Sequence, residues 1–252
     1  MIFEGRLTKA DGTLYVYADE VDLTNNAIMH LFSRIEYHLS NQLIESLNYA
    51  GQATTMLGLL NTQKTFQRLR VSINCGYKDK ATTAVKAVNG FAARHAYLIQ
   101  SPTVKGTFSF TIPMNNIVGF CDVYDKIVYG LKHNLTLVRK TDDDAIFRLA
   151  AVGAEKVRLI KISRFMPHVI PADAEKFSMY KTIESKVKLP VAYRTRQRDI
   201  LSISESTSFA WRLSVKTASE KPRFIIVAFQ TAKDGDQIKN PSTFDHVNLK
   251  NA

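Results

Sequence analysis

The sequence predicts an all-β protein, folded as an antiparallel sandwich with a few short helices in its connections. Short runs in which every second residue is apolar recur along the chain, as at Ile35, Tyr37 and Leu39, where polar residues lie between them. This period of two is typical of a half-buried strand. Turn-forming residues such as Asp11-Gly12 separate the runs, and few segments carry helical spacing.

The N-terminal part of the chain is predicted to form a hairpin followed by a helix. Residues 35–39 and 43–47 are the two strands of the hairpin, with residues 40–42 as a turn of about three residues. A helix of about three turns is predicted over residues 50–60, because apolar residues recur there at spacings of three and four. Further strands are predicted at 5–9, 14–17, 71–75, 106–112, 131–138 and 157–162, and a long surface loop at 78–96.

The C-terminal third is predicted to begin a second unit. Residues 165–171 contain two prolines, which favours an exposed connector and places a domain boundary near residue 166. A helix is predicted over 173–184, with Asp173 as its cap. Strands are predicted at 191–195, 208–215 and 223–230. The last is the most apolar run in the chain, so we expect it to be buried on both faces of a sandwich.

Composition limits the class of protein. The chain has 252 residues, of which 45% are hydrophobic, enough to bury a sizeable core in one large or two smaller domains. No apolar run approaches the roughly 18 residues of a membrane-spanning helix, and the first residues lack the layout of a secretory signal. Cys75 and Cys121 lie far apart, so neither a disulfide scaffold nor a zinc site is expected. These features predict an intracellular protein of a reducing compartment, with no membrane partner.

The charge is strongly basic. The chain has 34 basic and 23 acidic residues, a formal net charge of +11, which favours a polyanionic partner or a surface kept soluble by self-repulsion. Arg194, Arg196 and Arg198 alternate, so in a strand they would share one face and could neutralise phosphates. The alternative is a solvated strand edge that resists aggregation. The candidate polyanion contacts are Lys64, Arg68, Arg70, Lys186, Lys188, Arg194, Arg196 and Arg198.

Candidate metal-binding and catalytic residues favour structural roles. Residues 142–144 are three aspartates that could supply oxygen ligands to Ca²⁺, but they also suit an acidic turn, and the glycine and distal glutamate of a calcium-binding loop are absent. Cys121 lies in a mostly apolar stretch typical of a buried thiol, and no GxSxG motif is present. The histidines have neither HxH nor HExxH spacing and are predicted to be strand-surface or packed residues: His30, His38, His95, His133, His168 and His246. No enzyme activity, metal or cofactor is therefore predicted.

Four blocks of sequence together resemble one family of proteins. They are GRLTKADG at 5–12, LTNNAIMHLFSRIEYHL at 23–39, FTIPMNNIVGFCDVYDKIVYGLKHNLTLVRKTDDDA at 110–145 and KPRFIIVAFQTAKDGDQIKNPSTFDHVNL at 221–249. They resemble the double jelly-roll-like proteins of invertebrate genomes, which are related to the major capsid proteins of Polinton-type elements and adintoviruses. The blocks occur in the order and at the distances that this family has, and residues 62–100 carry the resemblance least.

The resemblance implies a structural protein. The fold class becomes a double jelly roll, with a first jelly roll over 1–166, short at its N-terminus, and the start of a second, truncated one over 167–252. The resemblance also implies assembly, because members of that family form trimers that tile an icosahedral shell. The expected partners are therefore further copies of the chain and, in addition, DNA or an acidic minor capsid protein. The expected location is the virion, or the host cytoplasm or nucleus during synthesis.

Two other functions stay open. Relatives continue past the FDHVNL block, so the chain is expected to be a fragment, a truncated genomic copy or one half of a pair, with an unpaired strand edge that a partner must cover. The first alternative is a β-sandwich module that binds nucleic acid or glycan. The second is a domesticated relic without a present function.

Overall fold

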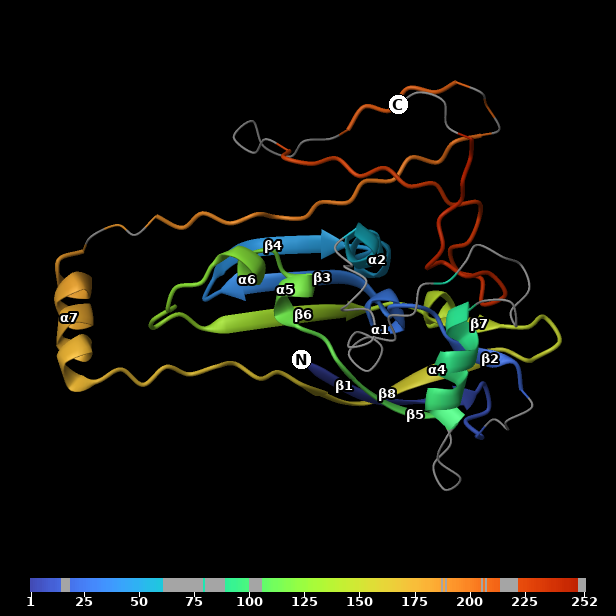
Figure 1. The fold of residues 1–252 in the computed structure, drawn as a ribbon, viewed down its shortest axis with the longest axis horizontal. Helices are drawn as coiled ribbons and strands as arrows, with labels where there is room; N and C mark the ends of the chain where they lie inside the picture. The colour runs from blue at the N-terminus through green and yellow to red at the C-terminus, as the bar shows by residue number, and fades with distance from the viewer. Residues whose placement is uncertain are drawn as a thin grey trace.

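The computed structural model describes residues 1–14, 19–60, 79, 89–99, 106–186, 188, 190–204, 206, 208–213 and 222–248. Two three-stranded antiparallel sheets dominate them (Figure 1). One sheet has the order β5-β1-β8, formed by Thr107–Thr111, Ile2–Lys9 and Glu155–Ser163. The other has the order β4-β3-β6, formed by Gln42–Asn48, Phe32–Leu39 and His133–Arg139. A short pair joins β2 (Val21–Leu23) to β7 (Ile146–Arg148).

The core lies between the two sheets. Phe3 of β1 and Phe110 of β5 are fully buried, and Ile35 of β3 is 2% exposed. The rings of Phe3 and Phe32 meet across the sandwich with their centroids 6.0 Å apart. Buried apolar side chains recur at every second position along much of each strand, as at Ile35, Tyr37 and Leu39 of β3, so one face of each sheet is apolar, as the alternation in the sequence predicts. Burial of this shared face is what holds the sandwich together.

The predicted hairpin of β3 and β4 is confirmed, with a shorter turn than expected. Leu39 pairs directly with Gln42, so the turn has two residues, Ser40 and Asn41, and not three. Ser40 has φ 52°, the positive value that a tight two-residue hairpin turn requires. β3 also pairs with β6 along its other edge, from Phe32 to Leu39. The hairpin is therefore the middle and one edge of a sheet, and its role is architectural.

The predicted helix α2 (Ala50–Leu60) is confirmed and follows the hairpin directly. Its first turns are buried against α1 (Ala27–His30), a single turn whose four residues are all buried. Gly51 permits this contact, because a Cβ at that position would come within 2.5 Å of the His30 ring. Two further single turns, α5 (Met114–Ile117) and α6 (Phe120–Val123), follow β5.

The predicted surface loop at 78–96 is wrong for its last part, which belongs to helix α4 (Asn89–Ile99). Phe91, Arg94 and Leu98 are buried and lie on one face of the helix. An arginine interrupts that apolar stripe, so hydropathy alone conceals the helix. The Arg94 guanidinium is neutralised by Asp79, 3.0 Å away, and lies 3.8 Å from Asp22. The predicted strand at 71–75 and most of the one at 14–17 lie outside the described residues.

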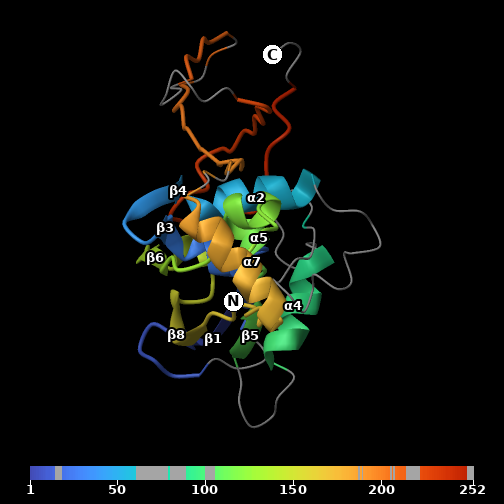
Figure 2. The ribbon, with the colours of Figure 1, turned by 90° about the vertical axis from the view of Figure 1, so that its left-hand side faces the viewer.

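Helix α7 (Asp173–Glu184) is confirmed and stands at the far end of the molecule, away from the sandwich core (Figures 1 and 2). The prediction that Asp173 caps it is wrong, because Asp173 is the first helical residue and Ala172 occupies the cap position. The Glu175 carboxylate accepts the Ala172 N–H instead, at 3.3 Å. The connector 165–171 is irregular and mostly exposed, as predicted. The domain division at residue 166 stays a prediction.

The three strands predicted after α7 do not form in the described residues. Residues 191–195, 208–213 and 223–230 have no strand assignment. The expectation that 223–230 is buried on both faces is also wrong, since Phe224 is 72% exposed and Ile225 61% exposed. The physical reason is that a strand exists only through pairing, and no neighbouring strand lies beside these residues in the part of the chain that the structure describes.

Burial of His30 makes the stability of the fold sensitive to acid. Burial lowers the pKa of His30 from 6.5 to about 4. Between pH 4 and 6.5 the imidazole of His30 is therefore protonated in the unfolded chain but neutral in the folded one. The free energy of unfolding consequently falls as the pH falls from 6.5 to 4. We expect this group alone to cost about 3 kcal/mol of unfolding free energy across that window.

Urea unfolding of wild type and His30→Asn between pH 4 and 7 checks this prediction. Burial raises the pKa of Glu155 to about 7, and this produces the opposite slope, so the difference between the variant and the wild type is the quantity to compare. His30→Asn should lack the part of the unfolding free energy that rises with pH between 4 and 6.5. His246→Asn, at an exposed position, is the control and should keep it. Equal slopes for wild type and His30→Asn would contradict the prediction.

Candidate functional site

The chain after α7 returns along the outside of the sandwich and is fixed there by a buried carboxylate. We call residues 190–213 the return arm; Figure 1 shows it running beside β4. Glu45 of β4 is 4% exposed, and its two oxygens accept the backbone N–H of Arg196 at 3.0 Å and of Gly119 at 2.6 Å. Burial raises the pKa of Glu45, and these hydrogen bonds oppose that rise. The carboxylate thus joins the return arm to the turn before α6.

Arg196 completes this attachment through its side chain. Its guanidinium donates to the carbonyl oxygens of Asn116 at 2.7 Å and Asn115 at 2.9 Å. Gly119 is required beside it, because a Cβ there would lie 2.1 Å from the Arg194 carbonyl oxygen. The Tyr193 ring packs edge-on against Phe120, with centroids 5.4 Å apart. The return arm is therefore docked at a specific position, although it forms no strand.

The next arginine of the arm also has an internal role. The Arg198 guanidinium lies over the Tyr49 ring, 4.4 Å from its centroid, in a cation–π arrangement. Burial lowers the pKa of Arg198, and nearby acidic groups, Asp234 first, oppose the shift. Lys140 lies near the same ring, at 5.9 Å. Arg196 and Arg198 thus hold the return arm in place.

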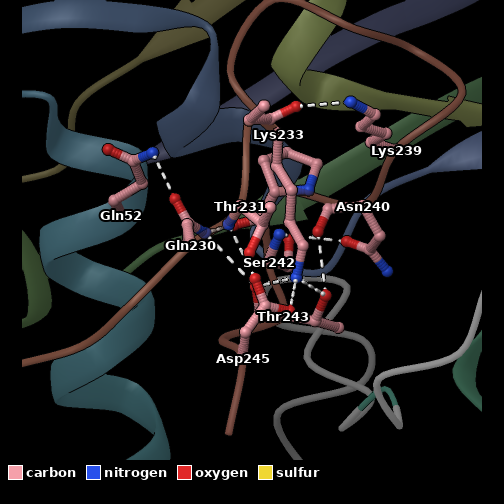
Figure 3. Close-up of polar contacts among 11 residues, drawn as sticks. Gln52, Gln230, Thr231, Lys233, Lys239, Asn240, Ser242, Thr243 and Asp245 are labelled. Atoms are coloured by element: carbon pink, nitrogen blue, oxygen red, sulfur yellow. Dashed lines mark hydrogen bonds and ion pairs between the residues drawn. The ribbon is translucent and has the colours of Figure 1, made fainter. Parts of the chain in front are cut away.

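A second attachment uses the loop formed by residues 230–245, which we call the C-terminal loop. Its middle is polar yet buried, with Gln237, Asn240, Ser242 and Thr243 all less than 9% exposed. Figure 3 shows hydrogen bonds within the loop. Lys233 Nζ donates to Thr243 and Asp245, and Lys239 Nζ donates to the carbonyl oxygen of residue 232. Buried polar groups are stable only when hydrogen-bonded in this way.

Several hydrogen bonds fasten the C-terminal loop to the rest of the protein. Gln52 of α2 donates to the Gln230 side chain at 2.8 Å (Figure 3), and the Ser242 hydroxyl donates to the Asn25 carbonyl. Gln237 inserts beside β8, where its amide both accepts the Glu155 N–H at 3.1 Å and donates to the Glu155 carbonyl at 3.0 Å. The Gln237 side chain thus takes the place of a paired strand at the start of β8.

The three aspartates that were predicted as possible calcium ligands all accept hydrogen bonds from other parts of the protein. Asp142 accepts from Arg139 and from the Val157 N–H, and Asp143 accepts from Gln237. Asp144 accepts from Lys140 and from the Gly235 N–H. Burial alone would raise the pKa of Asp144, but these two donors hold it below its usual value. The aspartates therefore fasten the C-terminal loop and two strands together.

Large apolar side chains remain exposed on the extended segments. On the return arm they include Val191, Ile200 and Phe209. Residues 222–229, which we call the apolar segment, expose Phe224, Ile225, Ile226 and Val227. The two segments meet where the ring of Phe209 contacts that of Phe229, with centroids 6.2 Å apart. Residues 226–229 also line an open groove of about 340 Å³ together with the end of α2 and residues 244–247.

The predicted polyanion contacts do not form one surface. Lys64, Arg68 and Arg70 lie outside the described residues. Lys186 and Lys188 are exposed just after α7. Arg194 is exposed, whereas Arg196 and Arg198 are partly buried by the contacts given above. The premise that 191–198 is a strand with its arginines on one face is wrong, and contact of these residues with a polyanion stays a prediction.

The structure gives no sign of a reactive cysteine or a metal site among the described residues. Cys121 is partly buried, and burial together with Glu45 raises the pKa of its thiol, which disfavours the reactive thiolate. No three acidic, histidine or cysteine side chains converge to hold a metal ion within the described ranges. None of the helices that the structure describes is long and apolar enough to cross a membrane.

These features define a class: an antiparallel all-β sandwich followed by extended segments that pair with no strand in the described residues. The family model of the double jelly roll-like domain matches residues 21–252. The chain belongs to this double jelly roll-like family, which confirms the predicted fold class and the double jelly-roll part of the predicted resemblance; the relation to Polinton-type and adintovirus capsid proteins stays a prediction. The double jelly roll is a structural fold of the capsid type, and no sheet closes into a barrel within the described residues. No curated protein and no solved structure matches the chain.

Neither buried attachment was foreseen from the sequence. A glutamate in a strand and glutamines in a polar loop look solvent-exposed in any sequence, because their burial depends on donors that are distant in the chain. One signal was available for the C-terminal loop. Its residues lie in the last of the four blocks that carry the family resemblance. The part of that block after residue 230 is mostly polar, which indicates a loop and not a strand.

Removal of the Arg196 side chain should loosen the return arm. We expect Arg196→Ala to raise the rate of chymotrypsin cleavage between Tyr193 and Leu201 by about 10- to 100-fold, because a lost charged hydrogen bond pair costs about 1.5–3 kcal/mol. Arg194→Ala is the matched control, since the side chain of Arg194 is exposed. Equal cleavage of both variants would contradict the assigned attachment.

Proposed function

We propose that the chain is a structural subunit of a capsid-type shell, which acts by self-assembly into trimers and has no catalytic role. Membership of the double jelly roll-like family supports the structural part of this proposal. The resemblance to the major capsid proteins of Polinton-type elements and adintoviruses supports the viral or endogenous-element origin. On this proposal the assembled chain resides in a virion or a related particle.

One observation carries the assembly part of the proposal. The apolar segment exposes four consecutive large side chains, from Phe224 to Val227, on a backbone without a strand partner. An exposed, unpaired and apolar extended segment is a template for pairing with another chain. The segment is also anchored, because Gln230 immediately after it is bound to Gln52. Assembly would then bury a surface that the subunit alone leaves in water.

A trimer fits this surface. Two different extended segments, the return arm and the apolar segment, are exposed on one subunit, so a contact between unlike surfaces can close around a three-fold axis. DNA or an acidic minor capsid protein is the additional partner that the net charge of +11 favours.

Light scattering of the purified chain at about 0.5 M salt tests the proposal, since exposed charge contacts are screened there whereas apolar contacts persist. We expect a trimer or a larger closed particle. Phe224→Ser with Ile226→Ser should give a folded monomer, and Ile127→Ser with Leu131→Ser, which changes exposed apolar residues elsewhere, should assemble like wild type.

A folded wild-type monomer at all concentrations would overturn self-assembly by this chain and favour the binding-module alternative. Assembly that survives the double substitution in the apolar segment would overturn the assigned surface.

A further inference from the structure

The outer face of the sheet β5-β1-β8 carries a group of basic residues that the sequence did not single out. Figure 2 shows the three strands side by side in the lower part of the sandwich. Phe3 and Leu7 of β1 are fully buried in the core, so Arg6, which is partly buried, points to the opposite, outer face, while Thr8 at the next outward position is buried. On β8, Val157 is buried, whereas Lys156 and Arg158 are exposed.

The register places like charges directly opposite each other. Arg6 pairs with Arg158 and Thr8 pairs with Lys156. On its other side Arg6 pairs with Thr107 of β5. Neighbouring strands are about 4.8 Å apart and outward residues recur about every 6.6 Å, so the three cations lie within reach of one another. Like charges directly opposite in a sheet are destabilising, and their presence here requires a reason.

No acidic group within the described residues neutralises these three side chains. Arg6, Arg158 and Lys156 have no carboxylate within ion-pair distance there, and the Nε of Arg6 is buried without a hydrogen-bond partner. The next row of the sheet is different, because Lys161 lies opposite Glu4. The uncompensated charge is therefore concentrated at the Arg6–Arg158 row and at Lys156.

We propose that this face binds the phosphate backbone of double-stranded DNA without reading its sequence. A phosphate group between Arg6 and Arg158 converts their repulsion into two charge-assisted hydrogen bonds. The partly buried Thr107 lies in the same row as Arg6, where its hydroxyl is a further donor. The outward positions of the three strands carry no aromatic side chain, so the face lacks the stacking platform of single-strand binders.

The proposal is independent of assembly, which uses the apolar segment. It also differs from the polyanion contact predicted at residues 186–198, because Arg196 and Arg198 are held by internal contacts. A net charge of +11 attracts DNA to the whole molecule, so the test must separate a local site from general attraction.

Fluorescence anisotropy with a labelled duplex of about 20 base pairs, titrated across salt concentration, makes this separation. Lys156→Gln with Arg158→Gln removes two cations from the face, and Lys126→Gln with Lys132→Gln removes the same charge from exposed positions outside this sheet and outside the predicted polyanion contacts. We expect the first variant to bind more weakly, with a slope of log K against log salt that is smaller by about two, and the second to retain the wild-type slope.

Three outcomes would overturn the proposal: no loss in the first variant, an equal loss in both variants, or tighter binding to a single strand of the same length than to the duplex. A second measurement is independent of DNA. Because Arg158→Gln relieves the repulsion with Arg6, its melting temperature without DNA should equal or exceed that of wild type. A lower melting temperature would show that the arginine pair is a structural element and would also count against the site.

Discussion

The structure depends on one constraint, the need of every extended backbone for hydrogen-bond partners. In the sandwich each strand meets this need through a neighbouring strand that is often distant in the chain, as when β1 pairs with β8. After α7 long stretches of the chain are extended but pair with no strand in the described residues. Hydrogen bonds hold the backbone at separate points, as at Arg196 and Phe229, and apolar side chains such as Phe224 are left exposed. The proposed function follows from this difference between the two halves.

The same constraint explains why the polar C-terminal loop is buried although the apolar segment just before it is exposed. The C-terminal loop can enter the sandwich because nearly all its polar groups find partners there, and Gln237 even pairs with the β8 backbone. The apolar segment just before the loop is fastened at its last residue, where the Phe229 carbonyl accepts the Asp245 N–H at 2.8 Å, while the large side chains before it stay exposed. The chain is fastened at Arg196 and again at Gln230, on either side of the exposed apolar side chains Phe209 and Phe224. These attachments reduce the conformational entropy that the chain loses when a partner binds.

The sequence predicted local structure well wherever a residue pattern and its partner strand were both present. The alternation in 35–47 and the spacing in 50–60 identified the β3–β4 hairpin and α2, because the buried face of each repeats at the expected period. Helix α4 was missed because Arg94 occupies a buried position that the carboxylates of Asp79 and Asp22 make possible. The strand predicted at 223–230 failed for the converse reason, since an apolar run specifies a strand only if another strand lies beside it. The site residues Glu45 and Gln237 could not be predicted, because long-range contacts alone give them their roles.

The central claim, that the apolar segment is the pairing surface of the assembly, is tested most directly by amide hydrogen exchange. Exchange of residues 223–228 should be compared in the dissociated subunit and in the assembled particle. The account predicts nearly unprotected amides in the subunit and a slowing of at least about 100-fold on assembly, as expected for backbone groups that gain strand partners. A particle in which these amides exchange as fast as in the free subunit would contradict it.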